Sequence, residues 1–323
     1  MNDDEMFRVD SFDDLLNALP TLFGFVPREC VIGLSVSGPT CRFGFRLRHD
    51  LPPRGREKAV AAGLAEHLVR HGREGFFLIA LSADAERARI MVTALRDALP
   101  VGRSWLVLWA DEDRVWSAVP GHPEEGVAYA LDRHHEAIVR AVAQGQVILA
   151  DRSELANEVA PPAEQDEERL DRTHDVALER FLERATTTDP ARFLTAERAR
   201  VAHLVERALG GADLAEEDLV ELAVLTSSMN VRDAVWPGIG RDNARGMHRL
   251  WAAVSRVASP DFAPAPLCLT GFAAWQMGDG ARALVALDRA LRLEPRYRMG
   301  LLLQDVLEAG VHPDRWSQAD VTA

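Results

Sequence analysis

The chain has 323 residues, of which 47% are hydrophobic and 27% charged, and this composition is that of a folded globular protein rather than a disordered one. Its net charge is −13 and both halves are acidic, so we expect neither a nucleic-acid partner nor an anionic membrane partner. Apolar runs stay below membrane-spanning length and the N-terminus is acidic, unlike a signal peptide, which predicts a cytoplasmic protein.

Residues 1–157 predict an α/β domain, in which a mixed sheet is packed with helices and edged by hairpins. Ser11 and Asp14 resemble a capping box ahead of a short apolar helix that we expect to stop at Pro20. Alternating or wholly apolar short runs then predict strands, and apolar residues three and four apart predict helices. The predicted strands are 30–36, 41–47, 76–81, 105–109, 115–119 and 147–150, and the predicted helices are 57–71, 85–99 and 132–144.

The composition changes at residues 158–169, where prolines and a run of charges interrupt the apolar pattern and predict a linker between domains. From 170 to 323 the apolar residues recur only at helical spacing, which predicts an all-α domain. A division into two domains also agrees with the chain length, which exceeds one typical core. The predicted helices are 170–184, 191–209, 216–229, 242–257, 267–277, 281–293 and 299–307.

Residues 264–297 resemble one tetratricopeptide repeat. Gly271 stands where the first helix needs a small residue, Ala283 and Leu287 are spaced to face it, and Pro295 ends the second helix. Three positions that carry bulky residues in such repeats are smaller or different here. The segment is therefore interpreted either as a helical hairpin of common packing geometry, which is favoured, or as part of a peptide groove, which needs several stacked repeats.

The motifs of common catalytic and cofactor sites are incomplete. Residues 33–37, GLSVS, lack the last glycine of a nucleophile elbow, and residues 238–243 carry two glycines of a dinucleotide fingerprint with no strand before them. His67 and His71 lie one helical turn apart, but the end of a helix explains His71 more simply than a metal does. We therefore predict no catalytic residue, metal or cofactor, and we lean against an enzyme without excluding one.

Two loop clusters combine charges with tryptophan and are the candidate interaction sites. The candidate residues are Arg114, Trp116, His122, Arg232, Asp233, Trp236, Arg241 and Asp242. The first three form one cluster, and the interpretation that we prefer for it is a polar rim over the edge of a sheet. The last five lie in a break between helices, and an Arg–Asp pair beside a tryptophan suits either a recognition anchor or a buried ion pair that joins two helices. We weigh these two interpretations evenly.

Several segments, in the right order, resemble the bacterial family known as domain of unknown function 4192. They include ALPTLFGFVPRECVIGLSV at 18–36, RHDLP at 48–52, DRVWSAV at 113–119, GQVILADRSEL at 145–155 and VRDAVW at 231–236. The family is uncharacterised, so the resemblance implies no activity, substrate or catalytic residue. Members commonly carry cysteines after the WS motif, whereas this chain has Val119, Pro120, Gly121 and His122 there, which puts a thiol or zinc role at that place in doubt.

Three functional hypotheses follow, in order of preference. The first is an interaction or adaptor protein without catalysis, whose partner is a protein or a peptide. The second is an enzyme or sensor that binds a small ligand at the strand ends of the α/β domain, where such folds usually bind ligands. The third is a structural homo-oligomer, since the sequence does not fix the oligomeric state.

Overall fold

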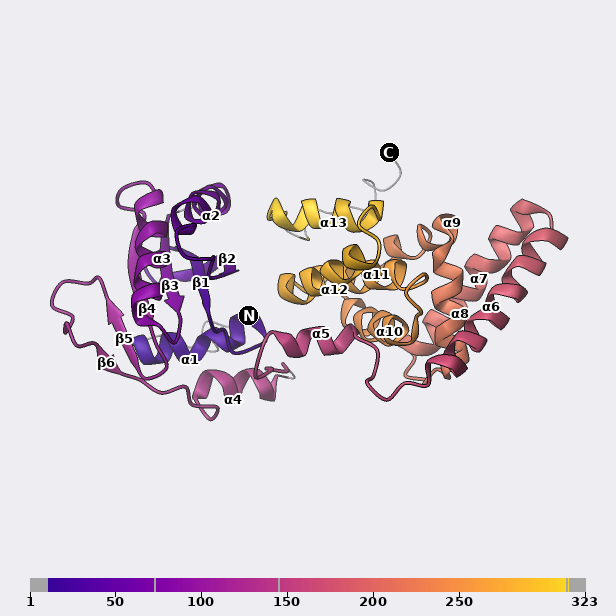
Figure 1. Cartoon of the computed structure of the whole chain (residues 1–323), viewed down its shortest axis with the longest axis horizontal. Helices are drawn as coiled ribbons and strands as arrows, with labels where there is room; N and C mark the ends of the chain where they lie inside the picture. Colours follow the sequence, from indigo (N-terminus) through magenta and orange to yellow (C-terminus); the bar gives the residue numbers. More distant parts are fainter. Residues whose placement is uncertain (1–10, 73, 145, 312, 314–323) are drawn as a thin grey trace. The chain divides into compact units, whose positions relative to one another are not determined.

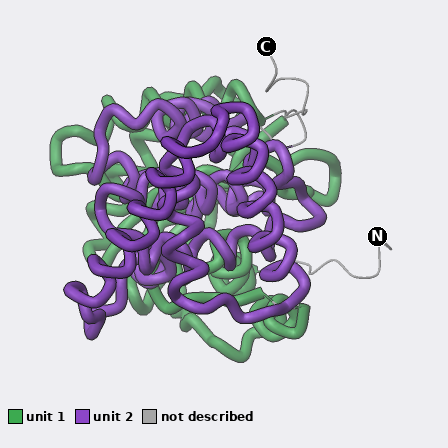
Figure 2. The backbone as a smooth tube through the Cα atoms, turned by 90° about the vertical axis from the view of Figure 1, so that its right-hand side faces the viewer, with its two compact units in different colours: residues 1–152 green, residues 153–323 purple. Residues whose placement is uncertain are grey.

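The computed structural model describes residues 11–72, 74–144, 146–311 and 313, and the acidic residues 1–10 noted above lie outside this range. The chain divides into two compact units, residues 1–152 and 153–323 (Figure 2). The first unit combines a mixed sheet with helices, and the described part of the second contains helices and no strand. The predicted fold class is confirmed.

The sheet of the first unit has its six strands in the order β2-β1-β3-β4-β5-β6. Neighbours β3 and β4 run parallel, and the other pairs are antiparallel, so that β1–β2 and β4–β5 are hairpins. The mixed pairing agrees with the prediction. The strands are β1 (Cys30–Ser37), β2 (Arg42–Asp50), β3 (Gly75–Leu81), β4 (Ser104–Ala110), β5 (Arg114–Ser117) and β6 (Val127–Ala128).

Four helices accompany this sheet (Figure 1): α1 (Phe12–Phe23), α2 (Glu57–His71), α3 (Ala85–Ala98) and α4 (Glu136–Ala143). Helices α2 and α3 share one core with the strand residues Val31, Phe76 and Leu78. Successive strand residues point to opposite faces, and Ile32, next to Val31, is also fully buried. Both faces of β1 are therefore covered, with α1 and α4 on the side opposite α2 and α3 (Figure 1).

Helix α1 was predicted to stop at Pro20, and this prediction is wrong, because the helix continues to Phe23. The Ser11 side chain accepts a hydrogen bond from the Asp14 backbone N–H at 3.0 Å, so the predicted cap is present. A proline inside a helix loses one backbone hydrogen bond and crowds the carbonyl four residues earlier, and here the burial of the apolar face of α1 outweighs that cost. The helix ends one turn later because Gly24 adopts a left-handed conformation, with φ of 76°.

The predicted strand at 147–150 is also wrong. Only one parallel bridge forms there, between Phe25 and Leu149. Val147 is 61% exposed, so this apolar run does not have the buried environment that would extend the pairing. The helix predicted at 132–144 begins later, at Glu136, because His135 has a non-helical backbone and caps the helix, with its Nδ1 accepting from the Ala137 backbone N–H at 3.4 Å.

The second unit is built around α11 (Pro264–Gln276), in which all 13 residues are buried. Four helices pack against it: α8 (Glu216–Ser227), α10 (Ala244–Val257), α12 (Gly280–Leu293) and α13 (Arg298–Glu308). A side chain at Gly271 would come within 3.1 Å of both the Ala283 carbonyl oxygen and the Leu287 side chain, so glycine allows the close approach of α11 and α12. The other helices of this unit are α5 (Ser153–Val159), α6 (Glu167–Thr187), α7 (Pro190–Leu209), α9 (Met229–Arg232) and the 3-10 helix η2 (Trp236–Gly238).

Helix α5 was not predicted, and it packs against α10 and α12. Its residues Leu155 and Val159 are one turn apart and buried, which explains why this short segment is helical. The helix covers residues that we had assigned to the end of the α/β domain and to the linker. None of the helices in the described ranges combines the length and apolar character that crossing a membrane requires.

Candidate functional site

The first predicted cluster lies on β5 and the loop that follows it. Arg114 Nη1 donates to two carbonyl oxygens of residues 124–126, at 2.9 and 3.1 Å, and Trp116 Nε1 donates to a third at 3.1 Å. His122 Nε2 lies 3.2 Å from the Val115 carbonyl oxygen. These contacts hold the β5–β6 loop in place, so they have a structural role.

The second predicted cluster lies in the helical unit. Arg232 donates from Nε and Nη2 to one carboxylate oxygen of Asp233, at 2.9 and 2.7 Å, and from Nη1 to the Tyr297 hydroxyl at 2.7 Å. Its guanidinium carbon also lies 5.4 Å from the centre of the Tyr297 ring. Burial acts to lower the pKa of Arg232, but the contacts with Tyr297 and Asp233 raise it overall. The arginine therefore ties the end of α9 to the turn before α13.

The remaining predicted residues lie on either side of a short loop. The Trp236 ring is 5.4 Å from that of Phe272 on α11, so it packs onto the central helix. Arg241 and Asp242 are exposed in the turn before α10. The side chain of Asn243 closes that turn, with bonds of 2.9 and 2.8 Å to the backbone of residues 238–240.

A third polar cluster, which the sequence did not single out, lies where β1 begins and β3 ends. Glu29 has a φ of 42°, which lies in the left-handed region that glycine adopts readily and larger residues avoid. Its carboxylate accepts from the Ala83 backbone N–H at 2.8 Å, from Ser82 Oγ at 3.0 Å and from Arg87 Nη1 at 3.1 Å. Strained backbone of this kind is often found at functional sites.

Arg48 belongs to the same end of the sheet. Its Nη1 lies 2.5 Å from an Asp50 carboxylate oxygen, its Nη2 donates to the Arg28 carbonyl at 3.2 Å, and its guanidinium carbon is 5.7 Å from the centre of the Phe25 ring. Burial raises the pKa of the neighbouring Cys30 thiol to about 11, so this thiol is protonated and unreactive at neutral pH. Arg48 thus joins two of the segments that carry the family resemblance, 18–36 and 48–52.

In the helical unit, charged side chains fix α5 to its neighbours. The Glu158 carboxylate accepts from Arg282 Nε at 2.9 Å and from Nη2 at 3.0 Å, and Arg282 Nη1 lies 2.5 Å from Asp279. Burial acts to lower the pKa of Arg282, but Glu158 and Asp279 raise it overall. His248 Nε2 on α10 is 4.0 Å from Glu158, and burial lowers the pKa of this histidine.

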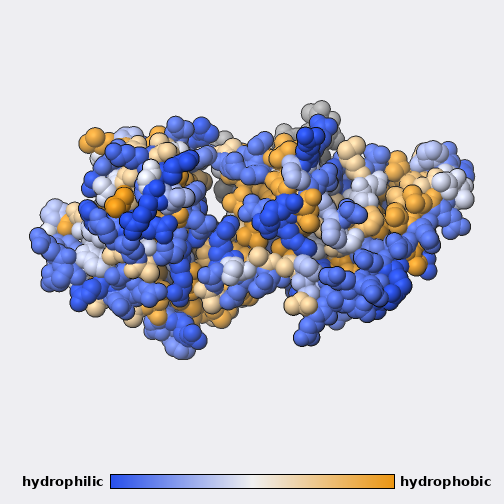
Figure 3. All heavy atoms as spheres, viewed as in Figure 1, coloured by the Kyte–Doolittle hydropathy of each residue, from blue (hydrophilic) through white to orange (hydrophobic). Residues whose placement is uncertain are grey.

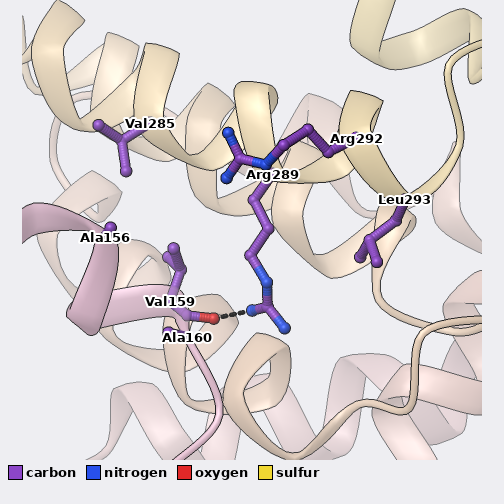
Figure 4. Close-up of a pocket in the computed structure, with 7 residues that line it drawn as sticks. All are labelled: Ala156, Val159, Ala160, Val285, Arg289, Arg292 and Leu293. Carbon is purple, nitrogen blue, oxygen red and sulfur yellow. Dashed lines mark hydrogen bonds between the residues drawn. The ribbon is translucent and has the colours of Figure 1, made fainter.

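Beside this network, an open hollow of about 290 Å³ lies between α5 and α12 (Figure 4). Five of its seven lining residues are apolar, two are arginines, and none of the seven is acidic. We call it the α5–α12 hollow. Its lining residues are Ala156, Val159, Ala160, Val285, Arg289, Arg292 and Leu293.

The two arginines of the hollow differ in their contacts. Arg289 Nη1 donates to the Val159 carbonyl at the end of α5, and to the Ser255 carbonyl on α10 at 3.1 Å (Figure 4). Burial, and then the positive charge of Arg292, lower the pKa of Arg289. Arg292 is exposed, and within the described part of the chain it has no hydrogen bond or ion pair. Its side chain runs back along α12 toward Val285 (Figure 4).

Sequence reasoning missed this hollow. Arg289 and Arg292 are three residues apart near the end of a helix, a pattern that basic residues commonly show because they compensate the helix dipole. Their environment depends on α5, which contacts Arg289 from 130 positions earlier in the chain. No local pattern could have indicated that pairing.

Nearly the whole length of the chain matches one family of proteins. The family model described as "Domain of unknown function (DUF4192)" matches residues 13–314, so the chain belongs to this family. The resemblance seen in the sequence segments is confirmed. No curated protein and no solved structure matches the chain.

Proposed function

We propose that this protein is a non-catalytic interaction module that binds a segment of another protein through its helical unit. The observation that carries the proposal is the α5–α12 hollow. A concave site with apolar walls and a few polar groups is the usual form of a binding pocket. The two arginines supply the polar groups, and the aliphatic residues of both helices supply the walls.

Exposed apolar side chains of the helical unit support the proposal. Leu293, which lines the hollow, is 39% accessible, and α13, which packs against α12, exposes Leu301 and Leu302 at 42% and 50%. Figure 3 shows apolar atoms gathered over this part of the helical unit. Apolar side chains that gather on a surface commonly mark an interaction site.

We propose that α11 and α12 form a tetratricopeptide-like hairpin that serves as scaffold. Because every residue of α11 is buried, that helix has no face left for a groove of its own. The binding surface that we propose therefore lies on the other side of α12, toward α5. We also propose a cytoplasmic location and no nucleic-acid or membrane partner, which the net charge of −13 supports.

A peptide selection tests the proposal. A T7 phage library that displays random dodecapeptides with free C-termini is panned against the wild-type chain, Ala160→Trp and Ala212→Trp. Ala160 lines the hollow, so the tryptophan fills it, whereas Ala212 is exposed in the loop before α8. We expect clones that wild type and Ala212→Trp enrich and that Ala160→Trp does not. Circular dichroism checks that both variants fold.

No enrichment on the wild-type chain, or equal enrichment on all three proteins, would show that the hollow is not an interaction site. A homo-oligomer, the remaining alternative, is excluded if light scattering at high concentration finds a monomer.

A second candidate function is the binding of a small ligand by the α/β unit. The observation that favours it is the left-handed backbone of Glu29, which sits where parallel strand β3 ends. A thermal-shift screen with a metabolite library tests it. A ligand that raises the melting temperature of wild type but not of Glu29→Gln would support this function, and a screen without hits would oppose it.

A further inference from the structure

We propose that the α5–α12 hollow binds the C-terminal residue of a partner chain, with its free carboxylate at Arg292 and an aliphatic side chain against the apolar walls. This inference rests on the proposed function and adds to it the chemistry of the ligand.

The size of the hollow favours a chain end. About 290 Å³ lies at the lower limit of typical small-molecule sites, so the hollow holds one or two residues. A C-terminal residue carries its carboxylate and its side chain on the same Cα atom, and both therefore fit within so small a space. An internal acidic residue would need room for the chain on both sides of it.

The charges favour an anion. Two arginines three residues apart line the hollow in a chain whose net charge is −13, and no lining residue is acidic. Guanidinium matches a carboxylate in a bidentate geometry. The lowered pKa of Arg289 reflects in part its repulsion from Arg292, which a bound anion would relieve.

The helix ends act against this charge but do not cancel it. Helices α5, α10 and α12 end near the hollow, and a helix C-terminus carries about −0.5 elementary charge. Three such ends sum to about −1.5 against two positive charges. Arg289 Nη1 is already bonded to the carbonyls of Val159 and Ser255, which fixes its guanidinium in place. Arg292, which has no hydrogen bond or ion pair to any residue that the structure describes, is therefore the arginine of the hollow that can bind the ligand.

Matched ligands test the inference. The probes are a hexapeptide ending in leucine, prepared as the free acid and as the amide, and N-acetyl-leucine. Binding is measured by calorimetry, and by heteronuclear NMR for the small probe. We expect the free-acid peptide to bind at least tenfold more tightly than the amide.

The variants are Arg292→Gln and, as control, Arg296→Gln. Both arginines are exposed, so both variants should fold, but Arg296 lies in the turn before α13 and outside the hollow. Arg292→Gln should weaken the binding of the free-acid peptide at least tenfold and leave the binding of the amide unchanged. Arg296→Gln should change the binding of neither peptide.

Equal binding of acid and amide, or equal losses in the two variants, would overturn the inference. N-acetyl-leucine that binds as tightly as the peptide would also overturn it, because the site would then take small carboxylic acids rather than chain ends. If phage clones depend on the hollow but bind equally well as amides, the interaction function stands and only the carboxylate chemistry is wrong.

Discussion

At the scale of single residues, Glu29 shows how backbone strain is held by side-chain bonds. A non-glycine residue in the left-handed region costs about 1–2 kcal/mol. The three hydrogen bonds to its carboxylate, from Ser82, Ala83 and Arg87, attach the start of β1 to the beginning of α3 and maintain this conformation.

Two substitutions separate the strain from the bonds. Glu29→Ala loses the carboxylate and keeps the strain, so it should lower the free energy of unfolding by about 1–2 kcal/mol. Glu29→Gly loses the same bonds but accepts a φ of 42° without strain, so it should be about 1 kcal/mol more stable than the alanine variant. Urea denaturation measures both. An alanine variant as stable as the glycine variant would show that the backbone there is unstrained.

The sequence could not have indicated this role for Glu29. Its partners follow it by 53, 54 and 58 positions, so they meet only after β1 and β3 have paired. The predicted residues Arg114 and Trp116, by contrast, bond to carbonyls only 8 to 12 positions away. Because its contacts are local, that cluster could be recognised from the residue types of one short stretch of sequence.

At the scale of helices, one buried carboxylate holds the α6–α7 pair together. Glu197 on α7 is fully buried, and its two oxygens accept from Arg184 Nε and Nη2 at 2.7 and 2.9 Å. The hydrogen bond to Glu197 raises the pKa of Arg184. Arg200 and Glu221, 3.5 Å apart, extend the network to α8.

Removing this carboxylate should destabilise the helical unit. Glu197→Ala leaves Arg184 without its closest partner, and the loss of one partner of a buried pair costs about 3–5 kcal/mol. Because Arg184 retains some access to water, we expect the lower end of that range. The control, Glu168→Ala, removes an exposed carboxylate 3.8 Å from Arg172 on α6 and should change little. Similar melting temperatures for the two variants would contradict this role of Glu197.

The helices and strands that the sequence predicted correctly are those with a sustained apolar period. The errors occur where tertiary contacts outweigh a local signal. Pro20 lies inside α1 because that helix is held by its buried face, and 147–150 is not a strand because its side chains are not buried. Helix α5 was missed because its seven residues are too few to show a period.

At the scale of the whole molecule, the fold class and the family could be predicted, but the site could not. The change of pattern after residue 158 separates a sheet-containing part from a helical part, and this is a property of the sequence itself. The α5–α12 hollow exists only because two helices far apart in the chain lie side by side. Its arginines are indistinguishable, as sequence, from those at the end of any helix.

Because all 13 residues of α11 are buried, the hydrogen exchange of its amides measures how often the helical unit opens. Amides in a helix surrounded on all sides exchange with deuterium only when the whole unit opens, whereas α6, with two buried residues out of 21, can open locally. We expect α11 to exchange most slowly in mass-spectrometric measurements. A ligand that binds the folded unit must slow that exchange further, by mass action, wherever it binds. Protection of α11 would thus detect a partner without a label and without knowledge of its site.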